Sequence, residues 1–456
     1  MNLSAPSPGQ IELQSSIEPR PAGSCVPLTA TQLQWWKNTA ERRNGISERL
    51  LHLAMRIHGA TDIALLHACL DTLVQRHEAL RTRIVASDSM PIQHVNDISA
   101  CSFDLVDLSQ SRSNEASALV THLAEAFVKE TVDLKIGPLF AARLFRLSAH
   151  EHVLVLAFEH IIADMLSIAI VQRELSALYR HGAHGRPLSI PQRPLQLGDY
   201  AFWQQATFSA WRGEHEAYWR SRLSNPPITE LPIDPRPELA QDCEYSSLEV
   251  PFGTALSSKL RDLARREQTS IAMIVLVIYV ATMTRWCNKR DLLIKFISHG
   301  RFRPELLSMV GFVAGYLHLR IETTDDDSFI DVLKRTTLEL QCAYEHRDLD
   351  RVPLIIPECS ANLYFDWIPA REQFVQPQDG SNEAELKIQS FPLEVAWPRE
   401  FLIWFRDSAT GVVASITYQT KRFRPQTIEQ LQRSLEIFAE EFSRRPRDPM
   451  SSIATP

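Results

Sequence analysis

The amino-acid sequence predicts an α/β protein built as two similar halves, and three observations support this prediction. The chain has 456 residues, more than one hydrophobic core usually supports, so two domains of roughly 200 residues each are expected. In both halves, short apolar runs of strand length alternate with stretches of helical periodicity. A segment rich in glycine and proline, residues 180–195, separates the halves and marks the domain boundary.

In the first half, residues 1–24 are rich in Ser, Pro and Gly, which predicts a flexible lead-in. The elements expected after it are a helix capped by Thr29, a strand over 49–57, an amphipathic helix over 62–77, a helix over 115–130 and a strand over 139–147. This order of strands and helices is typical of one complete α/β unit.

The second half repeats this order. We expect a strand over 246–251, helices over 256–266 and 271–286, strands over 291–297, 317–321, 400–406 and 412–419, and a final helix over 427–444. A polar stretch near 365–395 predicts a mobile crossover loop.

Composition excludes several classes of function. Hydrophobic residues make up 45% of the chain and charged residues 23%, as in an ordinary soluble globular protein. The net charge is −7 and basic residues are scattered, so nothing indicates nucleic acid or an anionic membrane as a partner. The longest apolar run, residues 271–281, is too short to cross a bilayer. The N-terminus lacks the pattern of a secretory signal, and we expect a cytoplasmic protein.

The cysteines argue against a metal centre. All seven lie far apart in the sequence and none forms a Cys-x-x-Cys pair, so neither a zinc site nor a disulfide framework is expected. The sequence also lacks a phosphate-binding P-loop, a dinucleotide-binding Gly-x-Gly-x-x-Gly and a nucleophile-elbow Gly-x-Ser-x-Gly. ATP-dependent and serine-hydrolase chemistry are therefore disfavoured.

The most informative stretch follows an apolar run, Val153–Phe158, that predicts a strand. Glu159 and His160 come directly after it, and Asp164 follows just before a helical pattern. A histidine at the end of a strand can point into a cleft, and the carboxylate can support it. Taken alone, such a histidine is more often a satisfied core residue, so the rest of the chain has to decide.

Several stretches together resemble the condensation domain of nonribosomal peptide synthetases. The matching motifs, in order, are Thr29–Trp36, Arg76–Thr82, Glu159–Met165, Asp199–Trp203 and Val310–Val313, with weaker matches at Arg351–Pro353 and Asn362–Phe365. Each motif is weak by itself, but five in the right order are specific, and they cover nearly the whole chain.

The resemblance implies two chloramphenicol acetyltransferase-like lobes, residues 25–185 and 186–456, that form a V-shaped pseudodimer with a central tunnel. Carrier proteins would bring thioester substrates on phosphopantetheine arms, so no bound cofactor and no metal are expected. A free-standing domain of this kind, expected as a monomer, would act in trans. It would transfer an acyl or aminoacyl group to the amine or hydroxyl of a carrier-bound or free small-molecule acceptor.

The resemblance also assigns site residues. The family motif His-His-x-x-x-Asp-Gly places the catalytic histidine at His160 and a structural aspartate at Asp164. By the same resemblance, Arg81 of the second motif would form the ion pair with Asp164. Ser298 and Tyr316 are candidates for lining the tunnel.

This sequence departs from the motif at two positions, where Glu159 replaces the first histidine and Met165 replaces the glycine. We interpret Glu159 as a structural replacement that accepts hydrogen bonds from backbone or an arginine. The alternative is a carboxylate that raises the pKa of His160. Met165 would narrow the tunnel floor. Two other functions stay open: a catalytically inactive condensation-like domain that recruits a partner enzyme, and a coenzyme A-dependent acyltransferase.

Overall fold

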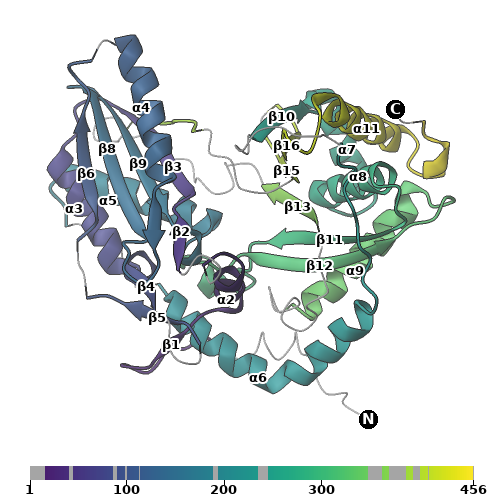
Figure 1. The fold of residues 1–456 in the computed structure, drawn as a ribbon, viewed down its shortest axis with the longest axis horizontal. Helices are drawn as coiled ribbons and strands as arrows, with labels where there is room; N and C mark the ends of the chain where they lie inside the picture. Colours follow the sequence, from purple (N-terminus) through teal and green to yellow (C-terminus); the bar gives the residue numbers. More distant parts are fainter. Residues whose placement is uncertain are drawn as a thin grey trace.

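Two lobes form the V shown in Figure 1, and helix α6 (Leu197–Arg222) joins them along its base. The structure is a computed structural model that describes residues 16–40, 45–85, 90–97, 100–111, 113–187, 194–234, 245–347, 362–368, 387–393, 401–408 and 410–454. The predicted arrangement of two α/β lobes as a V is therefore confirmed, and each lobe has its own sheet.

A five-stranded sheet forms the centre of the N-terminal lobe. Its strand order is β14 (Lys387–Ser390), β3 (Leu51–His58), β9 (Glu151–Phe158), β8 (Phe140–Ser148) and β6 (Phe103–Asp107). Three helices cover it: α3 (Ile63–Arg76) and α5 (Met165–Ala183) on one face, and α4 (Ser113–Val128) on the other. Because both faces are buried, β9 is apolar at consecutive positions instead of alternating.

Short elements complete this lobe. They are a sheet of β1 (Val26–Pro27), β5 (Ile92–Val95) and β4 (Thr82–Val85), a pair of β2 (Ile46–Glu48) and β7 (Thr131–Asp133), and helix α2 (Ala30–Trp35). The expected cap of α2 is confirmed: Thr29 accepts from the backbone of Gln32, whose side chain accepts in return from the backbone of Thr29.

A six-stranded sheet forms the C-terminal lobe. Its order is β10 (Tyr245–Pro251), β16 (Val413–Gln419), β15 (Phe401–Arg406), β13 (Leu363–Ile368), β11 (Asp291–Ser298) and β12 (Gly315–Glu322). Helix α8 (Ile271–Trp286) packs among α7 (Gly253–Arg266), α9 (Phe329–Glu345) and α11 (Pro425–Arg444). This burial on all sides explains its uninterrupted apolar sequence.

The segments expected to be flexible differ from the prediction where the structure describes them. Residues 16–24 are held in place, because Arg20 forms ion pairs with Glu78 and Asp199 at 2.7 and 2.8 Å. Strands β13 and β14 occupy the ends of the predicted crossover loop, and β14 carries the second half of the chain onto the sheet of the N-terminal lobe. Residues 1–15, 351–353, 369–386 and 394–400 lie outside the described residues.

Within the described ranges, no single helix has the length and apolar character to cross a bilayer. Helices α7 and α8 reach this length and apolar character only when taken together, and the two are bent by 106° relative to each other.

His318 on β12 is a buried histidine from which we expect a pH-dependent stability of the fold. Its side chain is fully buried, and neither ring nitrogen has a hydrogen-bond partner in the described part of the chain. Burial, with a smaller contribution from Lys295, lowers the pKa of His318 to about 3. The unfolded chain binds a proton near pH 6.5, so the free energy of unfolding should fall as the pH drops from about 6.5 toward 3, by up to about 1.4 kcal/mol per pH unit.

We expect His318→Leu to flatten this dependence in urea denaturation measured at pH 7, 6 and 5. The control is His122→Leu on α4, where the side chain is exposed. An equal pH slope in the wild-type protein and in His318→Leu would contradict the assignment.

Candidate active site

His160 lies at the junction of the lobes, on a short helical turn that follows strand β9. The strand ends at Phe158, and η4 (His160–Ile162) begins directly after it. Both turns here are capped by acidic side chains: Glu159 accepts from the backbone of Ile161, and Asp164 caps α5. Local sequence therefore sets the geometry, because Asp and Glu at these positions satisfy the first free N–H groups of each turn.

The imidazole of His160 is held in one orientation. Its Nδ1 lies 2.9 Å from the carbonyl oxygen of Ala163. A carbonyl only accepts, so Nδ1 carries the proton, and in the neutral ring Nε2 carries the lone pair. The ring packs between Trp35 and Phe312, with centroid distances of 4.9 and 4.3 Å. The arrangement presents Nε2 as a base.

Glu159 is fully buried and accepts hydrogen bonds from several donors. One carboxylate oxygen accepts from Trp35 Nε1 at 3.0 Å and from Ser47 Oγ at 2.7 Å, and the other accepts from the backbone of Ile161. Burial raises the pKa of Glu159, and these hydrogen bonds offset the effect only in part. The geometry supports the structural interpretation: Glu159 accepts from backbone, as one form of the interpretation had it, and also from Trp35 and Ser47. Through Trp35 it is linked to a ring that touches His160.

Asp164 forms an ion pair with Arg301, and this pair joins the two lobes. The two guanidinium nitrogens lie 2.7 and 2.9 Å from the carboxylate oxygens. The same carboxylate accepts from the backbone of Val313 and Ala314 at 3.1 Å, and from Ser167. Burial would raise the pKa of Asp164, but the charge of Arg301 and the hydrogen bonds outweigh it, so the pKa is lowered.

The prediction that Arg81 pairs with Asp164 is wrong. Arg81 lies at the end of the helical turn after α3, and its guanidinium donates to the carbonyl of Asn96 instead. Arg301 follows β11 in the C-terminal lobe, and Gly300 beside it has φ +70°. A Cβ at Gly300 would lie 2.3 Å from the carbonyl oxygen of Val313. The signal in the sequence that could have pointed to Arg301 is the run His299–Arg301, which follows the predicted strand over 291–297.

The remaining candidates for lining the tunnel lie in different settings. Met165 is the first residue of α5, and its side chain is 60% exposed. Ser298 is buried at the end of β11, opposite Gly315 at the start of β12. Tyr316 follows directly and packs against Tyr364. All three lie within a few residues of groups that form the site.

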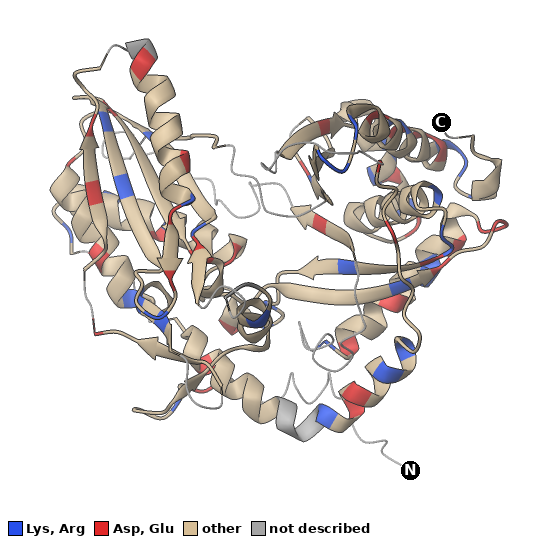
Figure 2. Cartoon of the chain, viewed as in Figure 1, with Lys and Arg blue, Asp and Glu red and all other residues tan. Residues whose placement is uncertain are grey.

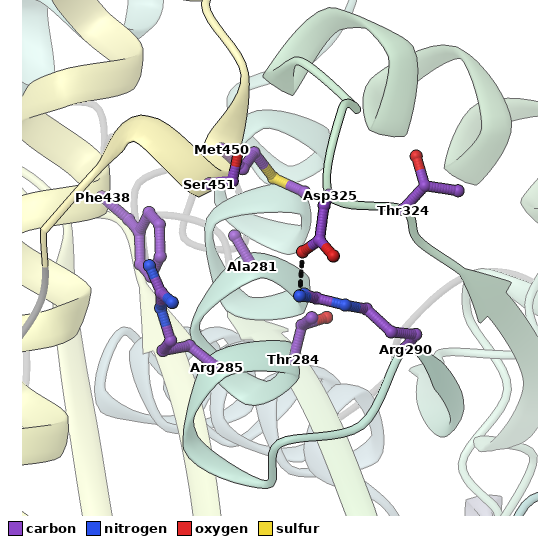
Figure 3. Close-up of a pocket in the computed structure, with 9 residues that line it drawn as sticks. All are labelled: Ala281, Thr284, Arg285, Arg290, Thr324, Asp325, Phe438, Met450 and Ser451. Atoms are coloured by element: carbon purple, nitrogen blue, oxygen red, sulfur yellow. Dashed lines mark hydrogen bonds and ion pairs between the residues drawn. The ribbon is translucent and has the colours of Figure 1, made fainter.

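One pocket lies away from this site. It is a hollow of about 330 Å³, open in part to solvent, near the start of β11, where Arg290 and Asp325 form an ion pair (Figure 3). The eight-residue strand β11 separates this pocket from the lobe junction by about 26 Å. Within the described residues, no group of His, Cys, Asp and Glu side chains is placed to hold a metal ion. Charged residues are scattered over both lobes (Figure 2).

Fold and site together define a chloramphenicol acetyltransferase-like protein: two α/β lobes with a His-x-x-x-Asp turn at their junction. The condensation domain family model matches residues 25–456, so the chain belongs to the condensation domain family of nonribosomal peptide synthetases.

Sequence relatives are parts of peptide synthetases. The chain is 28% identical over 431 residues to phosphinothricin tripeptide synthetase PhsC of Streptomyces viridochromogenes, an alignment that covers 92% of this chain and 39% of that protein. It is 28% identical over 450 residues to tyrocidine synthase 3 of Brevibacillus parabrevis, which covers 96% of this chain and 7% of that protein. The chain therefore spans less than half the length of these curated relatives.

Solved structures share the fold. The X-domain from teicoplanin biosynthesis superposes with a TM-score of 0.82 at 21% identity, covering 97% of this chain and 100% of that one. The same kind of X-domain has been solved in complex with OxyB, with a TM-score of 0.82 at 22% identity over 96% of this chain and 98% of that one. The starter condensation domain of rhizomide synthetase RzmA superposes with a TM-score of 0.77 at 16% identity, covering 95% of this chain and 100% of that one. At these identities the likeness concerns the fold alone.

Replacing Glu159 with glutamine should destabilise the fold. The single amide oxygen of glutamine can still accept from Trp35 and Ser47, but its NH₂ group then faces the backbone N–H of Ile161. Two buried donors without an acceptor should lower the free energy of unfolding by about 1–3 kcal/mol. Urea denaturation would measure the loss, with Glu115→Gln on the exposed surface of α4 as the control. Equal urea midpoints for the two variants would show that the hydrogen bonds of the Glu159 carboxylate do not contribute to stability.

Proposed function

We propose that this condensation domain transfers an acyl or aminoacyl group from a carrier-bound phosphopantetheine thioester to an amine or hydroxyl acceptor. The observation that carries the proposal is the orientation of His160. Its Nδ1 is committed to Ala163 and its Nε2 is the basic nitrogen of a ring held between two aromatic side chains. A histidine fixed in this way is suited to general-base catalysis near neutral pH.

The reaction needs one proton acceptor, and the site supplies one. As the acceptor nitrogen or oxygen attacks the thioester carbonyl, its proton passes to His160 Nε2. Collapse of the tetrahedral intermediate breaks the carbon–sulfur bond and completes the new amide or ester bond. The thiolate of the phosphopantetheine arm leaves and takes the proton from His160. Asp164 and Arg301 act by holding the two lobes, and hence the substrates, in register.

A second function has one specific observation in its favour. The X-domain that shares this fold has been solved in complex with OxyB. A condensation-like domain can therefore bind a partner protein, and Glu159 and Met165 depart from the family motif. Recruitment of a partner enzyme without catalysis is the competing proposal.

A single-turnover assay separates these proposals. The protein would be incubated with a carrier protein loaded with a radiolabelled acyl group on its phosphopantetheine arm and with an amine acceptor, and products would be followed by mass spectrometry. The same acyl group on coenzyme A serves as the comparison donor. Faster product formation from the carrier-bound donor supports the proposal. Preference for the coenzyme A donor would favour a coenzyme A-dependent acyltransferase, and no product from either donor would favour recruitment.

A further inference from the structure

Three side chains on neighbouring strands of the C-terminal sheet form what we call the lysine–tyrosine cradle: Lys295 on β11, Tyr316 on β12 and Tyr364 on β13. The ammonium of Lys295 lies 5.9 Å from the ring centroid of Tyr316 and 5.2 Å from that of Tyr364. The two phenol rings are 5.8 Å apart and meet edge to face. At these distances both rings attract the cation.

The strand register places the three cradle side chains on one face of the sheet, with Phe296 and Phe365 on the other. Lys295 lies beside Tyr364 in the parallel pair of β11 and β13, and Tyr316 lies beside Ile297 in the antiparallel pair of β11 and β12. Neighbours of the cradle along each strand, Leu317 and Phe365 among them, belong to the buried core. Because side chains alternate along a strand, the cradle residues point away from these core residues. On the cradle's own face, Leu293 on β11 and His318 on β12 are also buried, and Trp219 of α6 packs beside His318.

The cradle lies close to the candidate active site. Ala314 donates its backbone N–H to Asp164 at 3.1 Å. Tyr316 comes two residues later on β12, which is roughly 7 Å of extended chain. A group attached to the reacting carbonyl near His160 could therefore reach the cradle.

The charge of Lys295 is the feature that the fold does not explain. Among the residues that the structure describes, no carboxylate forms an ion pair with its ammonium. The side chain is partly exposed, and the two rings approach the cation without accepting conventional hydrogen bonds from it. An ammonium has three N–H donors, so donors stay available to a ligand where the Lys295 side chain is exposed.

We infer that the cradle binds a carboxylate on the transferred group or on the acceptor, so that this domain selects substrates with an acidic side chain. This inference rests on the proposed function for the identity of the site, but it concerns binding alone. Lys295 supplies the positive charge, and the two tyrosines hold it in position. A charge-assisted hydrogen bond of this kind discriminates strongly against a neutral group of the same shape.

Two stable probes test the inference. Both are pantetheine analogues in which an amide replaces the thioester. One carries a glutaryl chain that ends in a carboxylate, and the other carries the same chain ending in a primary carboxamide. Calorimetric titration of the wild-type protein should show at least about tenfold tighter binding of the carboxylate probe. Lys295→Met should abolish that preference, and Lys259→Met on the exposed surface of α7 should keep it.

Either of two results would overturn the inference: equal binding of the two probes by the wild-type protein, or the same carboxylate preference in Lys295→Met. Thermal melting of both variants checks that each is folded. Because the probes cannot react, a carboxylate preference without acyl transfer in the single-turnover assay would refute the proposed function and leave the cradle standing. Acyl transfer without a carboxylate preference would refute the role of the cradle and leave the proposed function standing.

Discussion

Replacement of His160 by alanine is expected to slow acyl transfer by about 10²–10⁴-fold, the usual contribution of a positioned general base. The expectation follows from the hydrogen bond between Nδ1 and Ala163, which leaves Nε2 as the basic nitrogen of the neutral ring. The ring makes no contribution to the lobe-joining ion pair, so the fold should be retained. Single-turnover kinetics with a loaded carrier protein would measure the effect.

The matched control for this variant is His184→Ala. Its Nδ1 also lies against a backbone carbonyl, that of Arg180 at 2.8 Å, but it is exposed at the far end of α5. We expect full activity from this control. If His160→Ala transferred the acyl group as fast as the wild-type protein, His160 would have no catalytic role. The non-catalytic recruiting function would then be favoured.

Replacement of Arg301 by methionine is expected to lower the free energy of unfolding by about 3–5 kcal/mol, because it leaves the buried carboxylate of Asp164 without its counter-ion. Both side chains are almost completely buried, at 0 and 2% exposed. The guanidinium also donates to the carbonyl oxygens of Met309 and Gly311, which would lose their partner as well. Urea denaturation would measure the loss.

Adding Asp164→Asn to Arg301→Met should recover part of this loss. The amide is neutral, and its oxygen can still accept from the backbone of Ser167. The control is Arg212→Met, which breaks an exposed ion pair with Glu216 on α6 and should cost less than about 1 kcal/mol. A loss from Arg301→Met as small as that of the control would contradict a stabilising role for the buried pair.

Local sequence predicted the elements whose pattern is strong. Helix α8 was recognised from its apolar run, the cap of α2 from Thr29, and strand β9 from consecutive apolar residues. Helix α9 was missed, although Ser328 and Asp331 form a capping box at its start. The shortest strands were also missed, because two or three residues carry too little periodicity to be read from sequence.

For the candidate site, too, the sequence predicted the part that local residues determine. His160, Asp164 and Glu159 lie on one continuous segment, where a strand end and two acidic caps already determine the turn. Trp35 and Phe312 pack against the imidazole from segments that lie far from it in the sequence. Sequence alone could not place these rings, since no local rule connects them.

The sequence by itself therefore determined the two-lobed α/β architecture, the family and the histidine that the proposed chemistry requires. These properties depend on periodicity, on capping residues and on motifs read in order. Only the tertiary structure decided which arginine meets Asp164, what Glu159 binds and where Lys295 points. Each of these depends on packing between strands and lobes. The sequence contains many arginines, and the fold decides which guanidinium lies beside the buried carboxylate of Asp164. That guanidinium belongs to Arg301, not to Arg81.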